Sequence, residues 1–425
     1  MTTRPEARAA RRAAVWITYG LCLLQVGAGL PAPIYPHYQK AWHLSAAVVT
    51  LLFVALIAGV VLGLLFVAPL ADVWGRKAIL VSGCTLGLVA AATYAVADRP
   101  PVLFSANLVQ GLAIGAFSGV TPAAISDLDL TGGAQTVGRL ITGANALGLA
   151  VGPLWSGLLQ QFAPWPNHFV FLVQIAMLCP LLLALLVFDE WKAVERRIRT
   201  SILPRLELHG SDVRWFVLAS AAGFCAFALG GLFSSLGSIV AHDLLSVRSA
   251  TLLGLFVTVL FAANAAAQLP LRRLAVMTGL RIGLALVVAG LAAVTIAPVA
   301  GGVALLLVGT AITGAGQGSV ITGGTALVSG LGDERTRAAT GSAFFIVCYT
   351  GTALPVLATG GVAAATTLYT ALIAFSLTIA AAACLIALAL QRQLRKDADA
   401  RGGHPELRAA AGSRAVISSA RVEQW

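Results

Sequence analysis

The spacing of charged residues is the feature that most constrains this chain. Nine uncharged runs are long enough to cross a bilayer: 13–39, 41–71, 78–97, 100–126, 140–188, 215–242, 249–271, 282–332 and 338–391. A hydrocarbon core of about 30 Å takes roughly 20 helical residues. Only 11% of the 425 residues are charged, whereas ordinary soluble domains carry about 25%. A soluble fold could not keep its surface hydrated with this composition, so the sequence predicts an all-α membrane protein.

Three of the runs are too long for one span, and each has a break signal near its middle. The signals are Ala-Pro-Trp-Pro-Asn at 163–167, the segment from Pro298 to Gly302, and Thr-Gly-Gly at 359–361. Interpreted as hairpins, these runs give six spans, and the remaining runs give one each. The sequence therefore predicts twelve transmembrane helices.

The longest polar interruption divides the spans into six and six. We expect an N-terminal segment at 1–12, a six-helix bundle at 13–188, a linker at 189–213, a second bundle at 214–390 and a tail at 391–425. The mixed charges of the linker and the Arg-rich composition of the tail favour solvated segments, with lipid-headgroup contact as the alternative. The tail is expected to be disordered.

Lysine and arginine set the expected orientation. With both termini in the cytoplasm, all but three of the 28 basic residues face the cytoplasm, the exceptions being Lys40, Arg99 and Arg248. The positive-inside rule therefore predicts a multi-pass protein of the plasma or inner membrane with cytoplasmic termini. The net charge of +11 is then a signal for topology, and no nucleic-acid partner is expected.

The sequence carries no sign of an enzyme. All six cysteines fall within predicted spans, so no disulfide or metal framework is implied. There is no nucleotide-binding Gly-Lys-Ser/Thr loop, no paired Cys or His metal spacing and no buried carboxylate dyad. We therefore expect no enzyme activity, no cofactor and no metal, and we expect a monomer in the lipid bilayer.

The two halves resemble each other weakly. Residues 113–119 align with 312–318, and Gly148 and Gly157 align with Gly351 and Gly360 at nearly the same offset. Duplicated six-span halves form a transporter architecture with its site between them, near the midplane. Random matching in glycine-rich helices is the alternative.

The loop between the second and third spans carries a specific pattern. Residues 68–77 read Ala-Pro-Leu-Ala-Asp-Val-Trp-Gly-Arg-Lys. This segment resembles G-x-L-A-D-R-x-G-R-K, the loop signature of the major facilitator superfamily. Asp72, Gly75, Arg76 and Lys77 match, whereas Ala68 and Val73 depart from it.

We interpret this loop as a latch between the cytoplasmic ends of helices. Gly75 suits the tight turn, and Asp72 can pair with Arg76 or lie against a helix N-terminus. Asp127 and Arg139 fall on the same membrane face with complementary charges, and we expect them to join the cluster. The cluster would form when the cytoplasmic side closes and break when it opens. The alternative is a charged loop that only obeys the positive-inside rule.

A second pattern lies in the fifth span, where Gly148, Gly152, Pro153 and Gly157 resemble the G-x-x-x-G-P-x-x-G-G signature of the family's antiporters. Ser156 replaces one glycine. Small residues four apart allow close helix contact, and the proline can kink the helix. In the family the pattern is associated with export, and the chain resembles its twelve-span drug/proton antiporter group. A generic Gly-Pro hinge is the alternative.

The predicted spans contain no Asp, Glu, Lys or Arg in their interiors. Even the early part of the fourth span, where such exporters often carry Arg, reads Asn-Leu-Val-Gln-Gly. Buried ionisable residues are the usual proton carriers, so proton coupling would need Asp127, Asp72 or a histidine near the outer face. These histidines, for which an interfacial role is the alternative, are His37, His43, His168 and His242.

A cavity without fixed charge favours neutral or lipophilic guests, held by apolar walls and a few amides. The candidate lining residues are polar or aromatic side chains within the spans: Gln25, Asn107, Gln110, Asn145, Phe224, Asn264, Gln317 and Tyr349. Each could instead join helices to one another.

The resemblance implies two six-helix bundles that open alternately to either side of the membrane. We expect an exporter of neutral or lipophilic small molecules, similar to drug-efflux proteins, that works in exchange for protons. The alternatives are an importer or facilitator of a neutral metabolite such as a sugar and, more remotely, a membrane sensor that transports nothing.

Overall fold

The computed structural model describes residues 4–128, 133–187, 211–271, 275–300, 302–331 and 337–402. Within these residues every regular element is a helix. Eleven helical segments are long and apolar enough to cross a membrane. Helix α1 (Arg4–Gly29) is the twelfth long helix, with basic residues in its first turns. The predicted linker lies outside the described residues up to position 210, as does the tail beyond 402.

Six of the long helices form the N-terminal bundle. After α1 the order is α2 (Tyr35–Trp42), α3 (Ala46–Leu62), the π-helical η1 (Gly63–Val67), η2 (Ala68–Leu70), α4 (Ala71–Trp74), α5 (Arg76–Ala95), α6 (Pro100–Ser126), α7 (Gly133–Phe162) and α8 (Pro166–Val187). The span from α3 to α4 is therefore one nearly continuous helix that ends at Gly75, whose φ of 90° is unfavourable for other residues.

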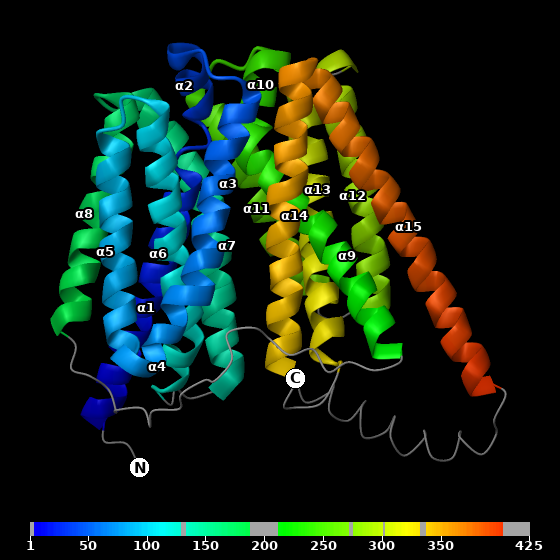
Figure 1. Ribbon diagram of the computed structural model, residues 1–425, viewed down its shortest axis with the longest axis horizontal. Helices are drawn as coiled ribbons and strands as arrows, with labels where there is room; N and C mark the ends of the chain where they lie inside the picture. Colours follow the sequence, from blue (N-terminus) through cyan, green and yellow to red (C-terminus); the bar gives the residue numbers. More distant parts are fainter. Residues whose placement is uncertain are drawn as a thin grey trace.

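The C-terminal bundle repeats this plan. Its order is α9 (Ser211–Leu232), the π-helical η3 (Phe233–Gly237), α10 (Ser238–Leu245), α11 (Ala250–Leu271), α12 (Val276–Ala300), α13 (Gly302–Ser329), α14 (Arg337–Ala365) and α15 (Leu368–Gly402). The two bundles lie side by side (Figure 1). We call the side where α1 begins and α15 ends the basic side, because Arg8, Arg76, Arg139, Arg214 and Arg281 lie near helix ends there, and the other the opposite side.

Two of the predicted hairpin breaks are confirmed, and the third is wrong. α7 ends before 163–167, and α12 gives way to α13 at 301. By contrast, α14 continues through 359–361 to Ala365. Gly360 does not end this helix but lies against α3, where an added Cβ would come within 2.1 Å of Thr50 Oγ1. The tail is also not disordered throughout, since α15 reaches Gly402.

Glycines bring neighbouring helices into backbone contact within each bundle. A Cβ on Gly111 would lie 2.0 Å from Leu56 O, and one on Gly314 would lie 2.2 Å from Leu260 O. The next glycine along each helix repeats this contact, because a Cβ at Gly115 or Gly318 would also lie 2.2 Å from a carbonyl oxygen. Helices α6 and α13 thus each use glycines one turn apart to approach a neighbouring helix of their own bundle.

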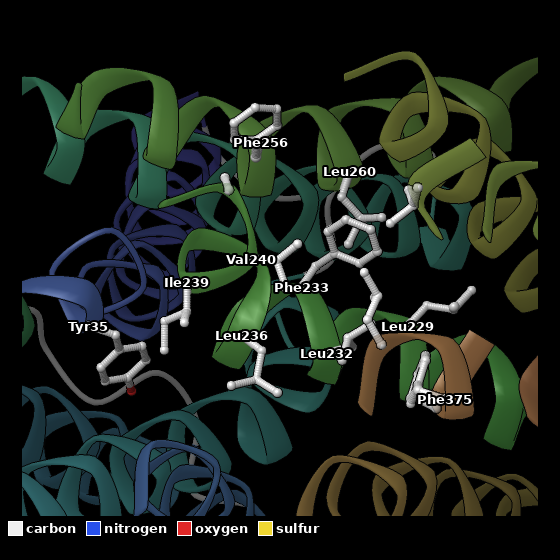
Figure 2. Packing of buried hydrophobic residues seen from close by; sticks show 14 of the residues in the cluster. Tyr35, Leu229, Leu232, Phe233, Leu236, Ile239, Val240, Phe256, Leu260 and Phe375 are labelled. Atoms are coloured by element: carbon white, nitrogen blue, oxygen red, sulfur yellow. The ribbon is translucent and has the colours of Figure 1, made fainter. Parts of the chain in front are cut away.

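The apolar core shows where the bundles meet. On the opposite side one cluster of buried residues includes Tyr35 and Leu52 of the first bundle with Leu236 and Ile239 of the second. Figure 2 shows the ring of Tyr35 beside Ile239 and Leu236. The rest of this cluster runs through the C-terminal bundle, whereas the N-terminal bundle has a large cluster of its own and a small separate cluster surrounds Phe344. The helices accordingly lie close together at the top of Figure 1 and diverge toward the bottom.

Candidate functional site

On the opposite side α7 and α11 join the two bundles through backbone contacts. Gln161 Oε1 accepts hydrogen bonds from Ser249 Oγ (2.7 Å) and from the N–H of Thr251 (3.1 Å). A Cβ on Gly157 would lie 2.4 Å from Ala250 O. These contacts continue along the two antiparallel helices to a hydrogen bond of 2.7 Å from Thr258 Oγ1 to the carbonyl of residue 150.

Helices α3 and α14 make a second contact between the two bundles on the opposite side. Gly360 lies against Thr50, and Val356 is fully buried in the core cluster of the N-terminal bundle. Gly157 and Gly360 are the pair that the sequence repeat relates. Each of them lies against a helix of the other bundle, so the opposite side is closed by two related helix crossings.

The halves part toward the basic side. Gly138 and Gly143 of α7 and Gly341 of α14 have no atom within 4 Å of an added Cβ. Because α7 and α14 are the helices that carry the contacts on the opposite side, the same two helices that close one side lead into open space at the other.

Amides and aromatic rings lie where the halves begin to part, and we call this set the central layer. Gln25 Nε2 donates to Asn145 Oδ1 (2.6 Å) between α1 and α7, and Gln268 Nε2 donates to Asn264 Oδ1 (2.7 Å) on α11. At a rise of about 1.5 Å per residue, both asparagines lie roughly 7–9 Å toward the basic side from the bond between Thr258 and residue 150.

The aromatic part of the central layer comes from α9 and α14. Tyr349 packs edge to face on Phe227, with ring centroids 5.7 Å apart, and also against the core cluster of the N-terminal bundle. Phe227 in turn meets Phe345, with ring centroids 6.4 Å apart. Of this layer, Gln25, Asn145, Asn264 and Tyr349 were predicted from the sequence, whereas Phe227, Phe345 and Gln268 were not.

The other predicted lining residues lie within single bundles. Asn107 donates to Leu103 O (2.8 Å), and Gln110 donates to Leu24 O (2.9 Å). Gln317 is buried and donates to Ala226 O (3.0 Å), while its own amide oxygen has no partner among the described residues. The half-buried Phe224 lies under Gly351, where a Cβ would be 2.5 Å from its carbonyl oxygen. Gln110 and Gln317 thus play related parts, each bonding its helix to the first helix of its bundle.

The glycines and proline predicted in the fifth span lie on two different faces of α7. Gly148 and Gly152 face α1, where an added Cβ would lie 2.5 Å from Cys22 O and 2.6 Å from Val26 O. The carbonyl of Pro153 instead faces α11, 2.2 Å from where a Cβ on Gly254 would lie. α7 therefore packs closely on its own bundle and on the other one over the same few turns.

The loop on the basic side holds the ends of three helices together. Arg76 forms an ion pair with Asp127, the C-cap residue of α6, and also donates to Ala123 O. Lys77 Nζ donates to Leu186 O (3.1 Å) at the end of α8. Cations suit these positions because helix C-termini expose unpaired carbonyls and carry partial negative charge. All of these contacts lie within the N-terminal bundle, so the pair of Arg76 and Asp127 exists while the basic side is parted.

Asp72 and Arg139 are placed differently from their loop neighbours. Both side chains are exposed, and neither takes part in an ion pair with a described residue. Asp72 lies one helical turn before Arg76 in sequence, and Arg139 lies on the part of α7 that faces open space. The structure therefore pairs Arg76 with Asp127. Asp72 is near enough for its charge to act on the Arg76 guanidinium but forms no ion pair, and Arg139 stays apart from this cluster.

Replacing Arg76 with alanine should lower the free energy of unfolding by about 1–3 kcal/mol. The side chains of Arg76 and Asp127 are only 20% and 29% exposed, so their interaction falls between that of surface and buried pairs. Thermal unfolding of the purified protein in detergent measures the loss. The exchanged pair Arg76→Asp with Asp127→Arg should recover part of it, and a double variant no more stable than Arg76→Ala would argue against the ion pair.

Known proteins resemble this chain in sequence. A family model described as the Major Facilitator Superfamily matches residues 17–246, just over half of the chain. A curated relative from Bacillus subtilis (strain 168), named as the uncharacterized MFS-type transporter YdgK, is 28% identical over 204 residues. That alignment covers 48% of this chain and 50% of the relative, so the chain spans about half the length of the relative it matches.

Solved structures resemble this fold over nearly its whole length. A bacterial homologue of the human lysosomal transporter Spinster, in an inward-facing and occupied conformation, matches with a TM-score of 0.75 and 15% identity, over 93% of this chain and 99% of that one. The nucleoside transporter NupG matches with a TM-score of 0.67 and 14% identity, over 91% and 99% of the two chains. At such identities the likeness concerns the fold alone.

Proposed function

The chain belongs to the major facilitator superfamily of membrane transporters, and on that premise we propose that it exports neutral or lipophilic small molecules by alternating access, in exchange for protons. The observation that carries this proposal is the composition of the central layer. The residues described there are amides, aromatic rings and apolar side chains, and every described Asp, Glu, Lys and Arg lies near a helix end. Such a layer offers hydrogen bonds and apolar surface but no counter-charge for an ionic guest.

The amides of the central layer are suited to uncharged guests in a second way. Gln25 and Asn145 are bonded to each other, as are Asn264 and Gln268. A guest with hydroxyl, carbonyl or amide groups can replace one of these mutual hydrogen bonds at little net cost, because neutral hydrogen bonds are exchanged for others of similar strength. The buried oxygen of Gln317 offers a further acceptor. The ring of Tyr349, on α14 of the C-terminal bundle, supplies an apolar wall.

Orientation follows from the charges. Since basic loops stay in the cytoplasm, we place the basic side there, in the plasma or inner membrane. The structure then corresponds to a state that is closed outside and parted inside, from which a guest enters from the cytoplasm. Closure of the basic side would bring the exposed Asp72 and Arg139 toward the second bundle, and we assign the latch to these two residues together with the fixed pair of Arg76 and Asp127.

An importer or facilitator of a neutral metabolite is the second candidate. It is favoured by the same lack of ionisable residues in the central layer, because facilitated diffusion requires no coupling ion.

Counterflow in proteoliposomes, with and without a pH gradient, separates the two candidates. Uncharged compounds that accumulate less in cells expressing the protein would serve as labelled substrates. The proposal predicts that an inwardly directed proton gradient drives export several-fold above counterflow alone. Counterflow that is indifferent to the gradient would instead support the facilitator, and preferential transport of multiply charged anions would contradict the proposed substrate class. Asp72→Asn, if it transports like the unmodified protein, would contradict the latch.

A further inference from the structure

A histidine on the opposite side lies between an acid and a base at the end of α10. His242 Nδ1 is 2.6 Å from Asp243 Oδ1, and Arg248 Nη1 is 2.9 Å from His242 Nε2. A guanidinium can only donate, so Nε2 must accept this hydrogen bond. The ring proton then sits on Nδ1, where it donates to Asp243. The observed arrangement therefore requires a neutral imidazole.

Arg248 adjoins a contact that closes the opposite side. The next residue, Ser249, donates to Gln161 Oε1 of the other bundle and accepts from the N–H of Leu252. Gln161 also accepts from the N–H of Thr251, so a side chain of α7 caps the first turn of α11. Only residues 246–249 connect α10 to α11. In so short a loop, holding Arg248 on the ring of His242 also holds Ser249 in register with Gln161.

We propose that His242 is a proton-binding site whose protonation releases Arg248 and weakens the closure of the opposite side. A proton on Nε2 would leave two N–H donors, one of His242 and one of Arg248, facing each other at hydrogen-bond distance. Both side chains would then also carry a positive charge. The imidazolium keeps Asp243 as its partner, so Arg248 is the group that leaves. Proton binding and docking of Arg248 exclude each other, and by linkage acid favours the open form of this side. Imidazole is the side chain that ordinarily changes charge between pH 5 and 8.

Few other groups can account for such a response. Of the elements packed against α10, α2 carries His37 and Lys40, which are exposed and form no hydrogen bond or ion pair with His242. It also carries the buried Tyr35 and Tyr38, whose hydroxyls stay neutral between pH 5 and 8. Helix α11, η3 and α13 contain no titratable side chain. On α15 the titratable group at this side is Tyr369, whose hydroxyl donates to Thr295 O (3.3 Å). The expected response therefore belongs to His242 with its two charged neighbours.

Distance measurement across the opposite side tests this proposal without any transported compound. The proposal rests on the proposed function only in requiring that this side opens at some stage. A failed transport assay would therefore count against the proposed substrates, whereas a failed distance assay would count against the role of His242. Spin labels on Ser105→Cys and Val299→Cys report the separation of the bundles, because both positions are exposed near this side, one in each bundle. The exposed Cys179 and Cys384 are replaced by serine in all variants.

The full-length protein in lipid nanodiscs should show a growing population of longer label distances as the pH falls from 8 to 5. For one coupled proton, the ratio of open to closed forms changes by up to about tenfold per pH unit. His242→Gln should hold the short distance at every pH, since glutamine can accept from Arg248 and donate to Asp243 but cannot take up a proton. Arg248→Ala should show the longer distances already at pH 8.

His168→Gln is the matched control. His168 also lies on this side, but its ring bonds to Ala95 O (2.7 Å) within the N-terminal bundle, so this variant should keep the unmodified response. A His242→Gln variant that responds to pH like the unmodified protein would overturn the proposal. An unmodified protein whose distances do not change between pH 8 and pH 5 would overturn it as well.

Discussion

Replacing Gly360 with alanine should shift this transporter away from the state that is closed on the opposite side by roughly 5- to 150-fold, with a matching loss of transport. The added Cβ would lie 2.1 Å from Thr50 Oγ1 and 3.0 Å from Thr50 Cβ. Thr50 is fully buried and its hydroxyl is bonded to Ala47 O, so it has little room to move. Overpacking of this kind costs about 1–3 kcal/mol, which corresponds to the stated shift in the ratio of the two states.

The variant should still fold, because the clash arises between bundles and disappears when they separate on this side. In the proposed orientation, a cysteine placed at Ala353, which packs against the first bundle, would then react faster with a membrane-impermeant maleimide added from outside. Initial rates of labelling in whole cells, beside the transport rate of a compound found by accumulation assays, measure both consequences.

The adjacent residue provides a close control. Gly361 has no atom within 4 Å of an added Cβ, so Gly361→Ala should behave like the unmodified protein. Thr50→Ala combined with Gly360→Ala removes the two nearest atoms and should restore most of the lost transport. Equal losses in Gly360→Ala and Gly361→Ala, or a double variant without recovery, would show that contact with α3 is not the cause.

The spans could be predicted from the sequence because hydrocarbon excludes charge, and charged residues therefore mark the ends of helices. The end of α14 could not be predicted in this way. Thr-Gly-Gly looks like a helix stop in water, but in a bilayer glycine is also the residue that allows close helix contact. Whether Gly360 ends its helix or packs against another one depends on Thr50, which lies on a helix far away in sequence.

The facing direction of polar residues was the least predictable part of the candidate site. In a soluble protein, polar residues mark the face of a helix that points to solvent. By contrast, α6 and α13 have apolar residues on all sides, because lipid and the protein interior favour the same side chains. Gln110 and Gln317 could therefore be recognised as polar residues in spans, but not as bonds within their bundles. The contact of Gln161 with Ser249 was missed because both lie at helix ends, where polar residues are ordinary.

Replacing Gly111 with valine should prevent the N-terminal bundle from assembling, at a cost of about 3 kcal/mol or more in the free energy of unfolding. Its Cβ would lie 2.0 Å from Leu56 O, a backbone atom that cannot rotate away. Gly115 makes the same kind of contact one turn later, so α3 and α6 would have to separate over at least two turns. Overpacking a tight contact typically costs 1–3 kcal/mol and occasionally more, and backbone-to-backbone contact leaves the least room for relaxation.

The yield of monodisperse protein after extraction in mild detergent, with its unfolding temperature, measures this effect. Gly138→Val is the control, because Gly138 is exposed on α7 with no atom within 4 Å of an added Cβ. A Gly111→Val variant with unmodified yield and unfolding temperature would mean that α3 and α6 do not pack this closely. The contrast with Gly360→Ala has a physical basis: the contact of Gly111 lies inside one bundle and is needed in every state, whereas that of Gly360 lies between bundles and is needed in only one.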